Sequence, residues 1–205
     1  MIYTTEWAWL HIPKTAGINF RERVGYEPGV TIADINISNA IACGKKYFNH
    51  QPLQWWLDNG TLNLSQFIFT FVRNPYARIV SLYNHMATSG NNPNLSPFKK
   101  FIMEDIDKGL RPDASFDVYH GKRVKFDFAW PQYKYLENDQ SIQVKFYKIE
   151  SELQQVEELV KYIFTDTRIN EKPHPPWETY YDSDSREKVE DFYMEDFKRF
   201  NYGLL

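Results

Sequence analysis

The 205-residue sequence has one cysteine, Cys43, which excludes an intrachain disulfide and a metal site built from several cysteines. It lacks an apolar run of about twenty residues and, near Met1, a basic stretch followed by a hydrophobic core, so neither a membrane helix nor a signal peptide is expected. Basic residues are not in excess either, and the net charge of −3 argues against binding to nucleic acid. These absences leave a globular protein in which Cys43 is expected to be packed.

The composition can support a sizeable core, because 42% of the residues are hydrophobic and 17% are aromatic. The length is near that of one α/β domain, and no internal repeat divides the chain. A single domain over residues 1–205 is therefore predicted. Basic clusters at 45–46, 99–100 and 122–125 are expected to be solvated surface charge rather than the rim of a cleft for an anionic acceptor.

A short loop with a lysine joins an apolar strand predicted over residues 7–10 to a helix predicted over 20–24. Backbone amides in residues 15–19 would then point outward at the start of the helix, where such groups bind phosphate or sulfate. Lys14 adds a full positive charge at the same edge. The loop predicts an anion site, although a lysine that merely faces solvent explains this loop alone equally well.

The order of residues in this loop differs from that of a Walker A loop. A Walker A loop has a glycine directly before its lysine and another further back, whereas here Gly17 follows Lys14. Ordinary ATP or GTP chemistry is thereby disfavoured. The side chains of Thr15 and Asn19 add hydrogen-bonding groups at the loop, and a nucleotide phosphate is its expected ligand.

A second strand, predicted over residues 67–72, ends at Arg73 and is followed by a helix whose first turn suits Pro75. In a parallel sheet, ligands gather outside the carboxyl ends of the strands, so Lys14 and Arg73 are expected to converge there. The planar guanidinium of Arg73 suits a phosphate, and the Ser81 hydroxyl is expected at the same group. The predicted buried face of the helix consists of Ile79, Val80, Leu82, Tyr83 and Met86.

These two motifs, each after a strand and in this order, give the chain a resemblance to the sulfotransferase superfamily, closest to the Golgi-type carbohydrate sulfotransferases. In that family a Pro-Lys-Thr-(Gly/Ala) loop holds the 5′-phosphosulfate of 3′-phosphoadenosine 5′-phosphosulfate (PAPS), and an Arg-(Asn/Asp)-Pro segment with a later serine holds the 3′-phosphate. The resemblance implies sulfuryl transfer from PAPS to a hydroxyl acceptor, expected to be a saccharide, which leaves 3′-phosphoadenosine 5′-phosphate (PAP). The implied cofactor-binding residues are Pro13, Lys14, Thr15, Ala16, Gly17, Ile18, Asn19, Arg73 and Ser81.

The similarity continues through Trp130-Pro131-Gln132 and over residues 146–150 and 192–202, so that it covers nearly the whole chain. Trp130-Pro131-Gln132 is accordingly expected near the acceptor or the cofactor. The resembling Golgi enzymes are anchored by an N-terminal membrane helix that this sequence does not contain. The chain is expected to be cytoplasmic and of bacterial or viral origin if it is complete, and luminal in the Golgi if an anchor has been removed.

The sequence departs from the family pattern at two places. Many members have glycine at the position of Ala16, a change that a cradle of backbone amides tolerates. Over residues 171–177 the family often has an asparagine and a serine in a loop that covers the cofactor. Lys172 and His174 are the candidates for that contact here.

The remaining elements predicted from the pattern are a strand over residues 144–149 and helices over 96–108, 151–164 and 184–200. Asp184 and Glu187 resemble a capping box at the start of the last helix. Strands interspersed with helices, with two anion loops at strand ends, predict an α/β fold, a three-layer sandwich, although periodicity alone does not distinguish a parallel sheet from a mixed one. The resemblance makes this the P-loop nucleotide-kinase-like sulfotransferase fold, with a central, mainly parallel sheet.

Attack by a neutral hydroxyl needs a group that takes its proton, and histidine suits that role near neutral pH. His50 is the predicted base, because it precedes Arg73 where the resembling family places a histidine, and His11 and His85 are the alternatives. Lys14 is the other predicted catalytic residue, since its charge would stabilise the oxygen that leaves with the 5′-phosphate. No metal is predicted, because the carboxylates show no clustered ligand spacing.

Two other functions stay open on the sequence alone. A nucleotide or small-metabolite kinase of related fold would need magnesium and an acidic ligand near the phosphate. A non-catalytic protein that binds PAP or PAPS would keep Lys14, Arg73 and Ser81 but lack an effective base. The acceptor and the oligomeric state have no readable signature, although six aromatic residues are candidates for stacking on a sugar or adenine, or for core and groove walls: Trp55, Trp56, Trp130, Trp177, Tyr180 and Tyr181.

Overall fold

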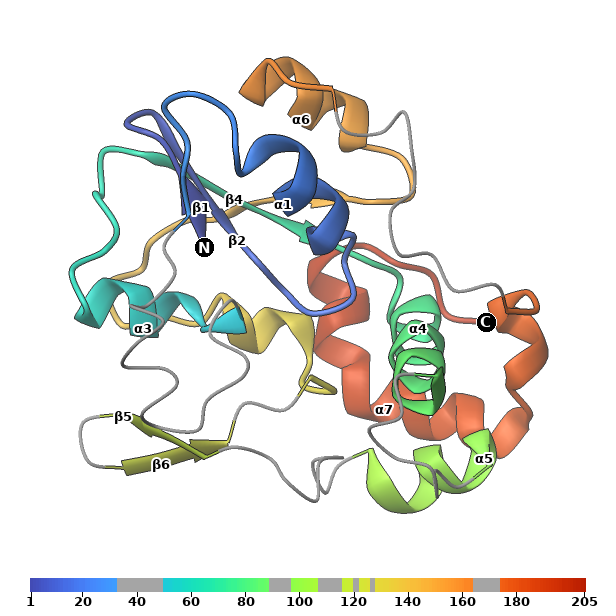
Figure 1. Cartoon of the computed structure of the whole chain (residues 1–205). Helices are drawn as coiled ribbons and strands as arrows, with labels where there is room; N and C mark the ends of the chain where they lie inside the picture. Colours follow the sequence, from blue (N-terminus) through green and yellow to red (C-terminus); the bar gives the residue numbers. More distant parts are fainter. Residues whose placement is uncertain (33–49, 89–96, 107–115, 120–121, 126–127, 164–173) are drawn as a thin grey trace. The chain divides into compact units, whose positions relative to one another are not determined.

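A computed structural model describes residues 1–32, 50–88, 97–106, 116–119, 122–125, 128–163 and 174–205 (Figure 1). Cys43, Lys45, Lys46 and Lys172 lie outside the described residues. The chain forms two compact units: the sheet unit, Met1–Val72 with Lys134–Asn170, and the helical unit, Arg73–Tyr133 with Glu171–Leu205. The single domain predicted over residues 1–205 stays a prediction.

The sheet unit is built on a five-stranded sheet whose strand order is β3-β1-β2-β4-β7. Strand β2 is parallel to β4, and β4 is parallel to β7, whereas β1 is antiparallel to both of its neighbours. The sheet is therefore only partly parallel. The strands are β1 (Ile2–Tyr3), β2 (Trp7–Leu10), β3 (Thr31–Ile32), β4 (Phe67–Val72) and β7 (Lys145–Lys148).

Successive side chains of β2 point to opposite sides of the sheet, and all four are buried. Both faces of the sheet are therefore covered, and helices cover them. Helices α1 (Gly17–Val24) and α6 (Leu153–Val160) lie on one face, and α3 (Leu53–Asp58) lies on the other (Figure 1). Two hydrophobic clusters result. The cluster under α1 and α6 contains Trp7, Trp9, Phe20, Phe69, Phe71, Val156 and Val160, and the one under α3 contains Ala8, Leu10, Leu53, Trp56 and Ile68.

The helical unit is centred on α4 (Pro75–Thr88), which packs against α7 (Ser183–Arg199) and the 3-10 helix η4 (Trp177–Tyr180). The helix predicted over residues 96–108 is instead α5 (Phe98–Lys100) followed by a π-helix, η2 (Phe101–Asp105). The remaining elements are a hairpin of β5 (Phe116–Tyr119) and β6 (Lys122–Lys125), and a 3-10 helix, η3 (Gln132–Tyr135), which begins in this unit. No helix among the described residues is long and apolar enough to cross a membrane.

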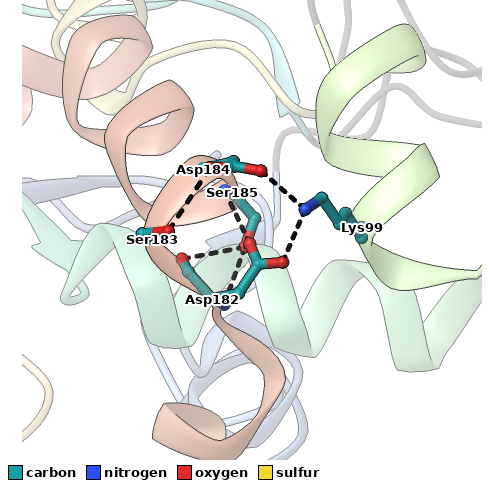
Figure 2. Close-up of polar contacts among 5 residues, drawn as sticks. All are labelled: Lys99, Asp182, Ser183, Asp184 and Ser185. Carbon is teal, nitrogen blue, oxygen red and sulfur yellow. Dashed lines mark hydrogen bonds and ion pairs between the residues drawn. The ribbon is translucent and has the colours of Figure 1, made fainter.

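Helix α7 starts one residue before the predicted position and uses a different capping pair. The Asp182 carboxylate accepts a hydrogen bond from the Ser185 N–H at 2.9 Å, and the Ser185 hydroxyl accepts one from the Asp182 N–H at 3.0 Å (Figure 2). The predicted box of Asp184 and Glu187 was therefore wrong. Aspartate is a favoured N-cap residue, and its position two residues earlier satisfies the first-turn amides.

Lys99 on α5 is ion-paired, although solvated surface charge was expected there. Its ammonium lies 2.7 Å from carboxylate oxygens of both Asp182 and Asp184 (Figure 2). Hydrogen bonds to these aspartates raise the pKa of Lys99, and the bonds from Lys99 and Ser185 hold the pKa of Asp182 below its usual range. Because the groups are exposed, the bridge adds little to stability and chiefly fixes where α5 meets the start of α7.

Candidate functional site

The loop between β2 and α1 has an unusual backbone. Lys14 and Ala16 both adopt left-handed conformations, with φ of 68° and 61°, which cost about 1–2 kcal/mol each for residues other than glycine. This conformation of Ala16 explains in physical terms why glycine suits the position in related loops. Ala16 is also the N-cap of α1, and alanine has no polar side chain to accept bonds from first-turn amides. No side chain therefore caps the start of α1, and backbone amides at helix starts of this kind can bind phosphate or sulfate groups.

Thr15 braces the loop from within. Its side chain is fully buried, and its hydroxyl donates a hydrogen bond to the Ile12 carbonyl oxygen at 2.8 Å. The hydroxyl proton is thus used inside the loop, so the group that Thr15 can offer to an anion is its backbone amide. Ile18, by contrast, is 41% exposed at the first turn of the helix.

Gly17 is required by the close approach of a ring. A Cβ atom added at Gly17 would lie 1.7 Å from Nε2 of His11, far inside any allowed contact. The His11 imidazole is buried and stacks on the Trp9 indole, with ring centroids 4.8 Å apart and planes inclined by 27°. Gly17, the first residue of α1, therefore packs directly against the ring of His11, which precedes the loop.

His50 lies against His11, with ring centroids 4.0 Å apart. Its Nδ1 is 3.2 Å from the His11 carbonyl oxygen. Because a carbonyl oxygen only accepts, Nδ1 carries the hydrogen in this contact, and Nε2 of the neutral ring then holds the lone pair. The contact fixes both the tautomer and the plane of the half-buried His50 ring.

Burial holds the pKa of His11 well below its ordinary value, and the positive charges of His50, Arg21 and Lys14 act in the same direction. The folded protein therefore keeps this ring neutral at pH values where the unfolded chain, with a histidine pKa of about 6.5, is protonated. The unfolded state then binds one more proton. The contribution of the neutral His11 ring to the free energy of unfolding is fully present above about pH 6.5. It is lost as the pH falls toward the folded-state pKa, with a slope of at most about 1.4 kcal/mol per pH unit.

His11→Phe is accordingly expected to weaken the loss of stability between about pH 7 and about pH 5, because phenylalanine keeps an aromatic ring on Trp9 and has no proton to gain. Urea denaturation at a series of pH values measures this. His174→Phe is the matched control, since His174 is a half-buried histidine of the helical unit. An unchanged slope in His11→Phe would show that another group carries the acid sensitivity.

The second predicted motif lies at the start of α4. The Asn74 side chain accepts a hydrogen bond from the Tyr76 N–H at 3.0 Å, so Asn74 caps the helix and Pro75 is its first residue. Arg73, the residue before this cap, is half-buried, and so is Ser81 further along α4. The predicted buried face of α4 is confirmed at Ile79, Val80, Leu82 and Met86, whereas Tyr83 is half-buried.

The predicted site residues fall into two groups, one in each unit. His11, Lys14, Gly17 and His50 lie together in the sheet unit, as the contacts above show. Arg73, Ser81 and the other residues of α4 belong to the helical unit. The expected convergence of Lys14 and Arg73 stays a prediction. Within the described part of the chain, no group of three or more histidine, cysteine, aspartate or glutamate residues is arranged to hold a metal ion.

The candidate aromatic residues have mostly structural surroundings. Trp56 is buried in the cluster under α3, and Trp55 packs against it edge to face. Trp177 stacks on the buried ring of Tyr76, with planes inclined by 6°. Two residues that were not predicted to lie in the core are fully buried and charged: Arg78 and Asp196. For Arg78, the signal available in the sequence was its position within the apolar face predicted for the helix that begins at Pro75.

A model of the sulfotransferase family matches residues 4–203 of the chain. No curated protein and no solved structure shows a significant match. The matched range includes the loop after β2 and the segment from Arg73 to Ser81, and it crosses both units.

Proposed function

Because the chain belongs to the sulfotransferase family, an enzyme family, and to its carbohydrate sulfotransferase type, we propose that it transfers a sulfuryl group from PAPS to a hydroxyl group of a saccharide. The observation that carries the proposal is the loop between β2 and α1, where left-handed Lys14 and Ala16 precede a helix start that no side chain caps. A loop of this kind suits the phosphosulfate end of the donor. Its position inside the matched range supports the same ligand.

The donor supplies an activated sulfuryl group, linked through oxygen to the 5′-phosphate. The amides at the start of α1 would bind its anionic oxygens, as helix N-termini do. Lys14 would add the full charge and stabilise the negative charge that develops toward the 5′-phosphate. The family resemblance also assigns Pro13, Thr15, Gly17 and Asn19 to this binding loop.

On the other side of the nucleotide, Arg73 and Ser81 would bind the 3′-phosphate. The guanidinium offers paired N–H donors that match two phosphate oxygens, and the serine hydroxyl adds one more donor. Both side chains come from the helical unit and are half-buried, which leaves part of each accessible to a ligand.

His50 would act as the general base. Its Nδ1–H is bonded to the His11 carbonyl, which leaves Nε2 as the nitrogen that accepts the proton of the acceptor hydroxyl. After it takes that proton, the imidazolium retains the His11 carbonyl as an acceptor for its Nδ1–H. The neighbouring His11 ring cannot easily share this role, because burial holds its pKa well below its ordinary value.

The proposal predicts that PAP stabilises the protein more than AMP does, because AMP lacks the 3′-phosphate. A ligand at a hundred times its dissociation constant adds about 2.7 kcal/mol to the free energy of unfolding, which thermal unfolding detects readily. In Arg73→Ala the advantage of PAP over AMP should fall by about ten- to a hundredfold in affinity, the effect of losing a charge-assisted hydrogen bond of about 1.5–3 kcal/mol. Arg186→Ala, which removes another half-buried arginine of the helical unit, is the matched control and should keep the preference.

Transfer is then measured with radiolabelled PAPS and a panel of saccharides. Incorporation of label into one saccharide class identifies the acceptor. Equal stabilisation by PAP, AMP and ATP, with no transfer, would overturn the proposed function. Stabilisation by ATP that requires magnesium would instead favour a kinase.

A further inference from the structure

Residues 128–133, here called the strap, are held by side chains of two helices. From α4, the fully buried Arg78 donates one bond to the Phe128 carbonyl at 3.1 Å and another to the Trp130 carbonyl at 2.6 Å. A guanidinium that is buried in this way restricts the strap, because its N–H donors would lose these two acceptors if the strap moved away.

Helix α7 also contacts the strap. The Tyr193 hydroxyl donates to the Ala129 carbonyl. The Asp196 carboxylate accepts the N–H of Gln132 at 2.7 Å through one oxygen and the N–H of Tyr133 at 2.9 Å through the other. The end of the strap is thus fixed to one turn of α7.

At this end of the strap, the Gln132 side chain grips the backbone of Arg73 at two points. The Arg73 N–H donates to Gln132 Oε1 at 2.9 Å, and Gln132 Nε2 donates to the Arg73 carbonyl at 2.8 Å. The same Nε2 lies 3.3 Å from an Asp196 oxygen. This pairing resembles that of a neighbouring strand and fixes both peptide planes on either side of the Arg73 Cα atom.

Neither Gln132 nor Asp196 exposes any surface to solvent. Burial raises the pKa of Asp196, while the charge of Arg78 and the three N–H donors act in the opposite direction. Both oxygens of the carboxyl group accept N–H donors, which favours the ionised form. Such a group is costly to bury, and the geometry that it holds is correspondingly well defined.

We propose that Gln132, held by Asp196, is a positioning residue that sets the direction of the Arg73 side chain for binding the 3′-phosphate. The inference rests on the proposed function, in which Arg73 binds that phosphate. An arginine side chain loses much conformational freedom when it binds an anion. Because the N–H and the carbonyl of Arg73 are both held, fewer orientations remain for its side chain to search before it binds. Gln132 then acts through Arg73 and touches no ligand.

The test replaces Gln132 with methionine, which has a similar volume and no hydrogen-bonding amide. Isothermal titration calorimetry gives the affinities of wild type and variant for PAP and for AMP. We expect the preference for PAP over AMP to fall about tenfold, while the affinity for AMP stays at the wild-type value, because only the 3′-phosphate depends on Arg73. A merely structural role would lower both affinities together or neither.

The matched control is Gln66→Met in the sheet unit. Gln66 is also a buried glutamine whose amide holds backbone, accepting from the Asn63 N–H at 3.0 Å and donating to the Thr4 carbonyl. The same substitution should lower the stability of the protein and leave the preference for PAP unchanged. If Gln66→Met lowers the preference as much as Gln132→Met does, general destabilisation explains the effect and the inference is overturned.

The remaining outcomes separate the inference from the proposed function. A wild-type protein that does not prefer PAP to AMP overturns both. A wild-type preference that Gln132→Met retains in full overturns the positioning role alone. If circular dichroism shows that Gln132→Met is unfolded, Gln132→Asn is measured in the same way, because its amide is one methylene too short for the grip on Arg73 and a retained preference again overturns the role.

Discussion

His50→Gln is expected to lower the rate of sulfuryl transfer by about 10²–10⁴-fold, the usual contribution of a general base. The glutamine amide can still donate to the His11 carbonyl, which accepts from His50 Nδ1 at 3.2 Å, so the local structure should persist. What disappears is the basic nitrogen. Binding of PAP should stay near the wild-type affinity, because in the proposed function the base acts on the acceptor hydroxyl and not on the nucleotide.

The comparison that makes this result specific is His85→Gln on α4. His85 is the other histidine outside the core that the sequence offers as a base. Transfer is followed at saturating donor, and kcat is measured over a range of pH. If His85→Gln loses turnover and His50→Gln does not, the base is His85. A loss of PAP binding in His50→Gln would show that the residue holds the loop rather than the acceptor proton.

Gly17→Ala is expected to cost about 3 kcal/mol of stability and to abolish PAP binding. The new Cβ atom would lie 1.7 Å from Nε2 of the buried His11 ring, which is packed between Trp9 and His50. Relief of the clash must therefore come largely from the start of α1, whose amides bind the anion in the proposed function. For a chain of this size the cost corresponds to a fall in Tm of about 6–12 °C, measured by thermal unfolding.

Two further variants test the cause of that loss. Gly203→Ala adds a Cβ atom that meets no described atom within 4 Å, so its stability should stay within about 0.5 kcal/mol of wild type. Adding His11→Ala to Gly17→Ala removes the opposing ring. The double variant should be less destabilised than the sum of the single variants, whereas simple additivity would mean that the two residues do not oppose each other.

The sequence predicted the elements that carry strong local signals. The apolar strand predicted over residues 7–10 and the helix that begins at Pro75 are both confirmed. The strand predicted over residues 144–149 is found at Lys145–Lys148. Strands β1 and β3 have two residues each, too few to show alternation, and they are the ones that make the sheet mixed. Family membership, expected from the two anion motifs, is confirmed as well.

The features that the sequence did not reveal depend on contacts between distant residues. The grip of Gln132 on Arg73 joins positions 59 residues apart, and its support from Asp196 joins positions 64 apart. Nothing in the local pattern distinguishes these polar residues from surface ones. The contact between His11 and Gly17 is close in sequence, yet it depends on how the loop turns, which the left-handed residues decide.

The register of the parallel strands has a consequence for the order in which the protein folds. Trp7 pairs with Phe67, and Phe69 pairs in turn with Lys145, so each parallel neighbour comes from a distant part of the chain. The cluster beneath α1 also needs Val156. Long-range pairings of this kind form slowly, because the chain must close large loops before the contacts stabilise it. During synthesis, the hydrophobic cluster beneath α1 can therefore be completed only after Val156 has left the ribosome.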